Sequence, residues 1–167
     1  EYTQNFTLAM LESPYKKDFI DKYGKLLFDN AEMAIKTFSP KIIPELQEEN
    51  ELVTQYGKLI ASAKIEFNGG TYSLSQLSPF KTSPDDELRL KAWKADGAWF
   101  KEHQGELNEI YDKLVKLRDK MGRKMGYDGY TELGYYRMSR NCYDKNDVEK
   151  FFSVIFYCKL LSRMLIL

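Results

Sequence analysis

The longest apolar pattern in the chain runs from Ser83 to Gly126 and predicts one long helix. Apolar side chains, with one histidine among them, recur there every three or four residues, which turns one helix face inward. The stripe consists of Leu88, Ala92, Ala95, Trp99, His103, Leu107, Ile110, Leu114, Leu117, Met121 and Met125. Ser83, followed by proline, is typical of a helix start, and Gly126 is typical of a left-handed helix end. Gly97 and the Gln104-Gly105 pair are positions where this helix could bend.

Two further helices are predicted before this run. Residues 1–12 are expected to be an extended lead-in, and Ser13-Pro14 then starts a helix that ends near Phe38. A second helix follows the tight Ser39-Pro40 corner, and we expect it to pack antiparallel to the first. The two apolar stripes are Tyr15, Phe19, Tyr23, Leu27, Ala34 and Phe38, and then Ile42, Leu46, Val53, Tyr56 and Ile60.

Alternation of apolar and polar residues replaces the helical period from Lys64 to Ser75. The two alternating runs are separated by Asn68-Gly69, a dipeptide typical of a tight β-hairpin turn. Because a two-stranded hairpin is only marginally stable by itself, we expect helices to pack against it.

The chain after the long run is predicted to form two more helices and an apolar tail. A turn at 127–130 leads into a short helix over 131–138, and Asp144 with Asp147 has capping-box spacing for the next helix. In the tail, residues 151–167, 13 of 17 residues are apolar. Two basic residues interrupt it, and it is shorter than the about 20 residues that span a membrane. We interpret this tail as the exposed core segment of a fragment or as the result of a frame shift.

The whole pattern predicts a mainly α fold with antiparallel helices, one long helix and a single β-hairpin. The expected parts are a helical pair over 1–62, the hairpin over 63–77, the long helix with the following short helices over 83–150, and the tail over 151–167.

Charge and cysteine content narrow the possible partners. Lysine and arginine together number 25, as do aspartate and glutamate, so the formal net charge is zero. A neutral chain gives no electrostatic reason to expect nucleic acid or an anionic membrane as a partner. Cys142 and Cys158 lack metal-binding spacing, which favours a reduced, cytoplasmic protein.

His103 is the only histidine in the chain, and Glu106 follows it at a spacing that could place two metal ligands on one helix face. Zinc commonly takes more histidine or cysteine ligands, so the alternative is a partly buried histidine with a hydrogen-bond partner. The same helix carries an acidic row that could hold Mg²⁺ or serve acid–base chemistry, or simply be solvated and paired with lysines. Its members are Glu102, Glu106, Glu109 and Asp112.

A cluster of tyrosine and arginine residues after the long run is the richest candidate binding site. Its candidate substrate-binding residues are Tyr135, Tyr136, Arg137 and Arg140. Aromatic rings interleaved with arginine can line a cleft or bind the carboxylate of a peptide. The alternative is core packing with an arginine at a helix end, which uses the same residue types.

Several linked segments resemble oligoendopeptidase F and its relatives among the thimet-oligopeptidase-like zinc peptidases. The resemblance covers roughly Leu59 to Phe151 and, more loosely, the two leading helices. It rests on the hairpin stretch Ala61–Leu77, the helix start Ser83–Arg89 with Ala92-Trp93, and the segments Glu109–Val115, Lys124–Tyr127 and Glu132–Asp144.

The resemblance implies an all-helical, two-lobed peptidase with a deep cleft that admits short peptides. It also implies a zinc ion held by a His-Glu-x-x-His helix and a later glutamate, with the motif's own glutamate activating water. The present sequence contains a single histidine and therefore lacks this motif. No catalytic residue and no metal ligand can be transferred to it.

Two functional hypotheses follow. The first is the N-terminal portion of a zinc oligoendopeptidase, which contributes a cleft wall, holds no zinc itself and is inactive alone. The second is a stand-alone helical module that binds peptides or another partner through the tyrosine and arginine cluster. The apolar tail suggests self-association in addition.

Overall fold

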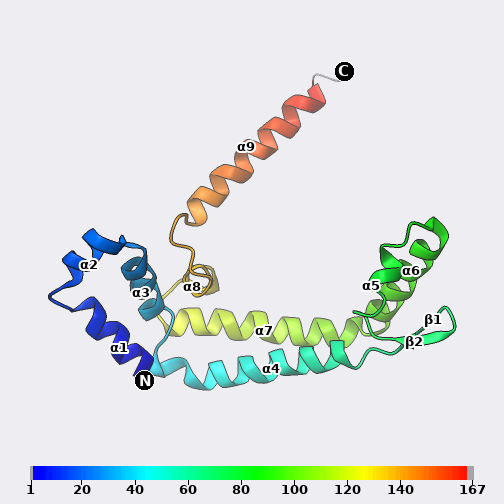
Figure 1. The fold of residues 1–167 in the computed structure, drawn as a ribbon, viewed down its shortest axis with the longest axis horizontal. Coiled ribbons are helices and arrows are strands. Elements are labelled where there is room, and N and C mark those ends of the chain that lie inside the picture. Colours follow the sequence, from blue (N-terminus) through cyan, green and yellow to red (C-terminus); the bar gives the residue numbers. More distant parts are fainter. Residues whose placement is uncertain (1, 165–167) are drawn as a thin grey trace. The chain divides into compact units, whose positions relative to one another are not determined.

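The computed structural model describes residues 2–164, and the side chains of residues 2–156. Most of these residues are helical, and the described strands form one two-stranded sheet. The mainly α class with a single hairpin is therefore confirmed. The chain divides into two compact units, one of residues 43–119 and one of residues 1–42 with 120–167 (Figure 1).

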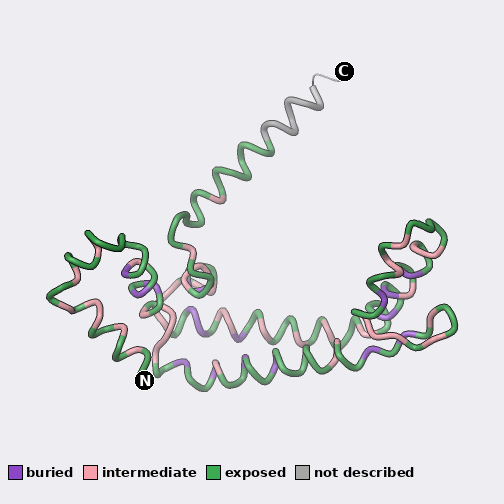
Figure 2. The backbone as a smooth tube through the Cα atoms, viewed as in Figure 1, coloured by how far each residue is buried: buried purple, intermediate pink, exposed green. Residues whose placement is uncertain are grey.

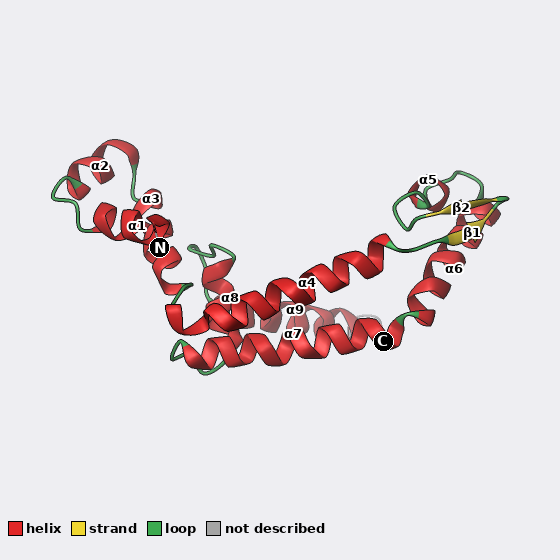
Figure 3. Ribbon diagram, turned by 90° about the horizontal axis from the view of Figure 1, so that it is seen from below, coloured by secondary structure: helices red, strands yellow, loops and turns green. Residues whose placement is uncertain are grey.

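Helices α4 (Ile43–Ala61) and α7 (Gln104–Lys124) run antiparallel and side by side (Figures 1 and 3). All of α4 and the part of α7 up to Asp119 belong to the unit of residues 43–119. Near the end of α7, Nε of Arg118 donates to Oε1 of Glu49, near the start of α4, at 2.7 Å. The predicted stripe of α4 is only partly inward, because Val53 and Tyr56 are exposed. The residues of α4 that are buried instead are Glu45, Glu49 and Leu52.

Strands β1 (Ile65–Phe67) and β2 (Gly70–Tyr72) form the predicted antiparallel hairpin. Asn68 and Gly69 make its two-residue turn with φ angles of 49° and 81°, the left-handed conformation that Asn-Gly favours. The hairpin packs with the short helix α5 (Ser78–Lys81) and with α6 (Asp86–Glu102). Their buried core consists of Ala63, Ile65, Leu77 and Trp99. The expected helical support of the hairpin is thus present.

The long apolar run is divided into α6 and α7 at His103 (Figure 3). His103 has φ −94° and ψ 9°, so the backbone leaves the helical conformation there. The division falls beside the Gln104-Gly105 pair, where glycine adds little helix propensity. Every member of the predicted stripe is nevertheless buried or half-buried, so the inward face predicted from the sequence is confirmed.

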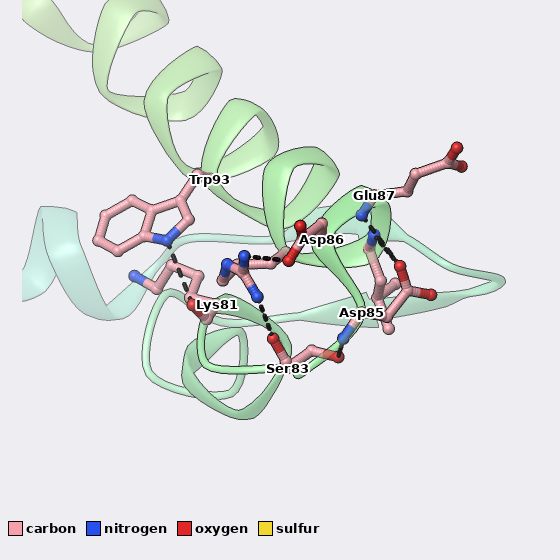
Figure 4. Close-up of polar contacts among 8 residues, drawn as sticks. Lys81, Ser83, Asp85, Asp86, Glu87 and Trp93 are labelled. Atoms are coloured by element: carbon pink, nitrogen blue, oxygen red, sulfur yellow. Dashed lines mark hydrogen bonds and ion pairs between the residues drawn. The ribbon is translucent and has the colours of Figure 1, made fainter.

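Helix α6 begins at a cap that differs from the predicted one (Figure 4). Oδ1 of Asp85 accepts hydrogen bonds from the backbone N–H groups of Glu87 at 2.9 Å and Leu88 at 3.2 Å. The predicted cap, Ser83, instead accepts the N–H of Asp85 through Oγ at 3.2 Å. A carboxylate at the cap also complements the positive end of the helix dipole, which a serine hydroxyl does less well.

The unit that contains the N-terminus begins with helix α1 (Tyr2–Leu11). The expectation of an extended lead-in is therefore wrong for these residues. The helix predicted between Ser13 and Phe38 is split into α2 (Lys16–Tyr23) and α3 (Leu26–Lys36). Gly24, with φ 83° and ψ 165°, stands at the split in a conformation that only glycine adopts readily.

The predicted stripe of this region also differs from the observed one. Its first four members, Tyr15, Phe19, Tyr23 and Leu27, are exposed. The residues that α3 buries are Phe28, Ala31 and Met33. The break at Gly24 resets the helical phase, so a single period carried through both helices selects the wrong face of α3.

Helix α7 ends at Lys124, and Gly126 forms the predicted left-handed conformation just after it. The φ angle of Gly126 is 91°, and its N–H donates to the carbonyl of Arg123 at 3.0 Å. The N–H of Tyr127 donates to the carbonyl of Gly122, also at 3.0 Å. These two bonds satisfy carbonyls that a helix end would otherwise leave unbonded.

The short helix α8 (Tyr130–Arg137) follows and packs near α3. Two hydrogen bonds join the segments that flank α8 to α3. The hydroxyl of Tyr127 donates to the carbonyl of Lys36 at 3.0 Å, and Nδ2 of Asn141 donates to Oδ1 of Asn30 at 2.8 Å. A 3₁₀ turn, η1 (Pro40–Ile42), closes the first 42 residues of this unit.

Helix α9 (Lys145–Met164) starts at the predicted capping box. Oδ1 of Asp144 accepts the N–H of Asp147 at 3.1 Å, and Oδ2 of Asp147 accepts the N–H of Asp144 at 3.0 Å. Among the side chains of α9 that the structure describes, the exposed large apolar ones are Phe151, Phe152, Val154, Ile155 and Phe156. Figure 2 colours most of this first part of the helix as exposed. No helix in residues 2–164 combines the length and the apolar character of a membrane span. The apolar ending predicted at 164–167 lies outside the described side chains.

Candidate functional site

A hollow of about 350 Å³ opens where α8, the loop after it and the start of α9 meet. This volume lies at the lower end of the range for small-molecule sites, roughly 300–1,000 Å³. Side chains of mixed character line it, among them Glu132, Tyr135, Tyr136, Arg140, Tyr143 and Lys145. An open hollow of this size suits the end of an extended ligand.

Arg140 lies against two tyrosine rings at this hollow. Its guanidinium carbon is 4.4 Å from the ring centre of Tyr135 and 5.4 Å from that of Tyr143. The two rings meet edge to face, with centres 6.2 Å apart. The backbone N–H of Arg140 donates to the carbonyl of Tyr135 at 3.1 Å, which fixes the chain at the end of α8. Local backbone structure and ring contacts thus position the same arginine.

Tyr136 and Glu132 form a hydrogen-bonded pair on the same helix. The hydroxyl of Tyr136 donates to Oε1 of Glu132 at 2.9 Å, and Nζ of Lys36 lies 5.0 Å from the Tyr136 ring centre. The bond to Glu132 raises the pKa of the Tyr136 phenol above its ordinary value, and burial adds to this shift. The Glu132 carboxylate is therefore partly engaged by a neutral phenol.

The rim of the hollow carries charges of both signs. Asp144 is engaged as the cap of α9, and the backbone N–H of Asp147 holds the pKa of its carboxyl below the ordinary value. Lys145 and Arg140 supply positive charge beside Glu132 and Asp144. A hollow of balanced charge favours a ligand with a positive and a negative group over a purely anionic one.

Three of the four predicted substrate-binding residues meet at this hollow, namely Tyr135, Tyr136 and Arg140. Arg137 does not line it. Its guanidinium donates to the hydroxyl of Tyr130 at 3.2 Å and lies over that ring. The helical period accounts for this placement, because Arg137 and Tyr130 are seven residues, two turns, apart and share a face.

Six lining residues were absent from the predicted set, among them Glu132, Tyr143 and Lys145. Tyr143 stands three residues after Arg140, in the same aromatic-rich segment, so composition alone could have indicated it. Glu132 could have been found from its spacing, since it precedes Tyr136 by one helical turn. Lys145 lies beyond the loop, and no local pattern places it at the hollow.

The side chain of His103 packs against Trp99. Its ring stacks on the indole of Trp99 with centres 4.2 Å apart, and Nδ1 lies 2.9 Å from the carbonyl oxygen of Trp99. A carbonyl can only accept, so Nδ1 carries the hydrogen and donates. The alternative of a partly buried histidine with a hydrogen-bond partner is thus confirmed.

Two members of the acidic row, Glu109 and Asp112 on α7, are paired with lysines one turn away. Oε1 of Glu109 binds Lys113 at 2.6 Å, and Oδ2 of Asp112 binds Lys116 at 2.7 Å. The hydrogen bond from Lys113 lowers the pKa of the Glu109 carboxyl. Among the side chains of residues 2–156, no three His, Cys, Asp or Glu residues converge as metal ligands would. The described residues therefore do not fit a zinc centre.

Comparisons with solved structures find peptidases that are similar to this chain. The chain is 39% identical to an oligoendopeptidase F structure over 96% of its own length, with a TM-score of 0.80. It is 42% identical to PZ peptidase A, solved with an inhibitor, and 38% identical to an oligoendopeptidase F from Bacillus anthracis. These two matches each cover 92% of the chain, with TM-scores of 0.80 and 0.81.

The matches involve only part of each relative. The chain spans 30%, 27% and 28% of the three structures, in the order given. A scan against protein-family models finds no match, and a search of curated proteins finds none either. Because identity and fold agree over more than nine tenths of the chain, it resembles a part of these oligoendopeptidase structures that makes up about three tenths of their length.

Proposed function

We propose that this chain is the N-terminal portion of a zinc-dependent oligoendopeptidase that hydrolyses short peptides. In this proposal it contributes one wall of the substrate cleft and is inactive alone, because the His-Glu-x-x-His segment lies in the part of the enzyme that it lacks. The observation that carries the proposal is the match at 38–42% identity over 92–96% of the chain but only 27–30% of the relatives.

The division of chemistry within the proposed enzyme follows from the residues present. A catalytic zinc site needs three protein ligands, usually including histidine. The chain has one histidine, and its ring is stacked on Trp99. The chain is therefore proposed to contact oligopeptides without holding the metal. We also propose a cytoplasmic location and no nucleic-acid or membrane partner, in keeping with the zero net charge and the cysteine content.

Complementation tests this function. The 167-residue chain is mixed with the remaining part of an oligoendopeptidase F relative, loaded with zinc, and cleavage of an internally quenched oligopeptide is followed by fluorescence. We expect no cleavage by either part alone and measurable cleavage by the mixture. Inclusion of a chelator should abolish it. Persistent inactivity of a mixture that forms a stable complex would count against the proposal.

A second candidate function is a stand-alone module that binds peptides or another partner. The hollow formed by Tyr135, Arg140 and Tyr143 favours it, because it is complete within the present chain. This function predicts saturable peptide binding by the isolated chain that neither zinc nor chelator changes. The two candidates are separated by whether the complementing part confers cleavage.

Self-association is proposed in either case. The exposed apolar side chains at the start of α9 include Phe151, Phe152 and Phe156. Exposed apolar clusters tend to be covered by association. Sedimentation velocity over a range of concentrations should show a species heavier than the monomer, and a concentration-independent monomer would exclude this.

A further inference from the structure

We infer that the guanidinium of Arg140, held against Tyr135 and Tyr143, is a binding site for a carboxylate group of an oligopeptide. The inference names the group that the hollow recognises. It rests on the proposal that this chain contacts peptides, and it extends that proposal to a particular side chain.

Two tyrosine rings hold the side chain of Arg140 in place. The two tyrosine rings contact the guanidinium at 4.4 Å and 5.4 Å from their centres. Ring contacts of this kind engage the guanidinium as a cation and do not use its N–H groups as hydrogen bonds to an acceptor. They restrict the side chain while leaving donors that can form two parallel bonds to a carboxylate.

Among the side chains of residues 2–156, no carboxylate is hydrogen-bonded to the Arg140 guanidinium. Within residues 2–156, the interactions of the Arg140 side chain are the two ring contacts. The two nearby carboxylates in the lining have other partners. Glu132 accepts from Tyr136, and Asp144 accepts from the first N–H groups of α9. Within the described part of the chain, the Arg140 guanidinium thus lines the hollow without an ion-paired carboxylate.

Arg137, three residues before Arg140, has similar contacts but a different position. Arg137 also lies over a tyrosine ring, but its guanidinium donates to the hydroxyl of that same Tyr130 and it does not line the hollow. The two arginines therefore have the same charge and the same kind of aromatic neighbour. They differ in access to the hollow, which makes Arg137 a matched control.

Two kinds of peptide carboxylate could bind to Arg140. A peptide offers its C-terminal carboxylate or an aspartate or glutamate side chain, and both present the same planar group to arginine. The acidic groups of Glu132 and Asp144, which also line the hollow, disfavour a ligand with several negative charges. A single carboxylate on an otherwise neutral or cationic peptide fits this arrangement.

Isothermal titration calorimetry with three N-acetylated tripeptides tests the inference. One ends in a free carboxylate, the second is its C-terminal amide, and the third is an amide with a glutamate side chain in the middle. We expect the wild-type chain to bind at least one carboxylate peptide about ten- to a hundredfold more tightly than the neutral amide, as a charge-assisted bidentate contact would give. Which carboxylate peptide binds more tightly identifies the source of the group.

Variants assign this preference to a residue. Arg140→Gln should remove the preference for the carboxylate peptides, Arg140→Lys should retain part of it, and Arg137→Gln should leave it unchanged. Circular dichroism should show the same helical content in all three variants. The lysine variant keeps the test valid if the glutamine variant is poorly folded.

Any one of several results would overturn the inference. These are equal binding of acid and amide peptides, an undiminished preference in Arg140→Gln, and equal losses in the Arg140 and Arg137 variants. Absence of peptide binding by the wild-type chain at millimolar concentration would overturn it as well. Cleavage by the complemented enzyme is measured separately, so the peptidase proposal can stand when this inference fails.

Discussion

The ammonium group of Lys81 donates to Oδ1 of Asp96 at 2.8 Å, and the two side chains are only 17% and 11% exposed. Lys81 ends α5, and Asp96 lies in the middle of α6. Trp93 of α6 adds a second hydrogen bond to Lys81, because its Nε1 donates to the backbone carbonyl of Lys81 at 3.2 Å (Figure 4). These contacts hold the short helix α5 on α6.

Breaking the Lys81–Asp96 ion pair should destabilise the chain more than breaking an exposed pair. We expect Asp96→Asn to lower the free energy of unfolding by about 2–4 kcal/mol, because a largely buried ammonium loses its counter-ion. Glu87→Gln, which breaks the exposed Glu87–Lys91 pair on the same helix, should cost less than about 0.5 kcal/mol. Urea unfolding measures the free energy of unfolding of both variants. Equal decreases would show that the buried ion pair stabilises the chain no more than the exposed one.

Gly122 is expected to tolerate no side chain. A Cβ there would lie 2.1 Å from the carbonyl oxygen of Gly129, which is backbone and cannot rotate away. Gly122→Ala should therefore lower the free energy of unfolding by about 2–4 kcal/mol, as other overpacked or strained sites do. Gly57→Ala is the control, because a Cβ on this α4 residue meets nothing within 4 Å.

The control variant should change stability in the opposite direction. Alanine has a higher helix propensity than glycine, so Gly57→Ala should raise the free energy of unfolding by about 0.5–1 kcal/mol. Thermal melting followed by circular dichroism separates the two variants. A Gly122→Ala chain as stable as the wild type would show that the turn at 127–130 does not pack against α7 as described.

The raised pKa of Tyr136 predicts a dependence of the hollow on alkaline pH. The phenol donates to Glu132 only while protonated, so this bond's contribution to stability is complete below the ordinary phenol value of about 10. It is lost as the pH rises through the raised pKa of Tyr136. Tyrosinate absorbance of the wild type minus that of Tyr136→Phe isolates this one titration.

Glu132→Gln is the matched variant for this titration. It removes the negative charge and the strong acceptor, so the Tyr136 pKa should move back toward its ordinary value. A Tyr136 titration at or below pH 10 in the wild type, or one that Glu132→Gln does not move, would contradict the hydrogen bond at 2.9 Å as the cause.

The sequence predicted the turns and helix ends that depend only on neighbouring residues. The Asn68-Gly69 turn, the Gly126 helix end and the Asp144 cap each depend on residues within one turn of the chain, and all three are confirmed. The apolar stripe through α6 and α7 also holds, because its period continues across the division at His103.

Features that depend on distant partners were not predictable in the same way. The burial of Glu49 is stabilised by Arg118, which is 69 residues away in the sequence. An inward-facing glutamate interrupts any apolar period, so the pattern favoured Val53 and Tyr56 instead. At the candidate site, Tyr135, Tyr136 and Arg140 were found from composition, whereas Lys145 enters the hollow only through the loop between α8 and α9.

The zinc content of the purified chain and of its complex with the complementing part is the most direct test of the central claim. The claim is that this chain supplies peptide-binding surface to an oligoendopeptidase and that the rest of the enzyme supplies the metal. Elemental analysis after exhaustive dialysis should find essentially no zinc in the chain alone and about one zinc in each active complex. One tightly held zinc in each isolated chain would contradict the claim and would place a metal site at His103 or elsewhere in this sequence.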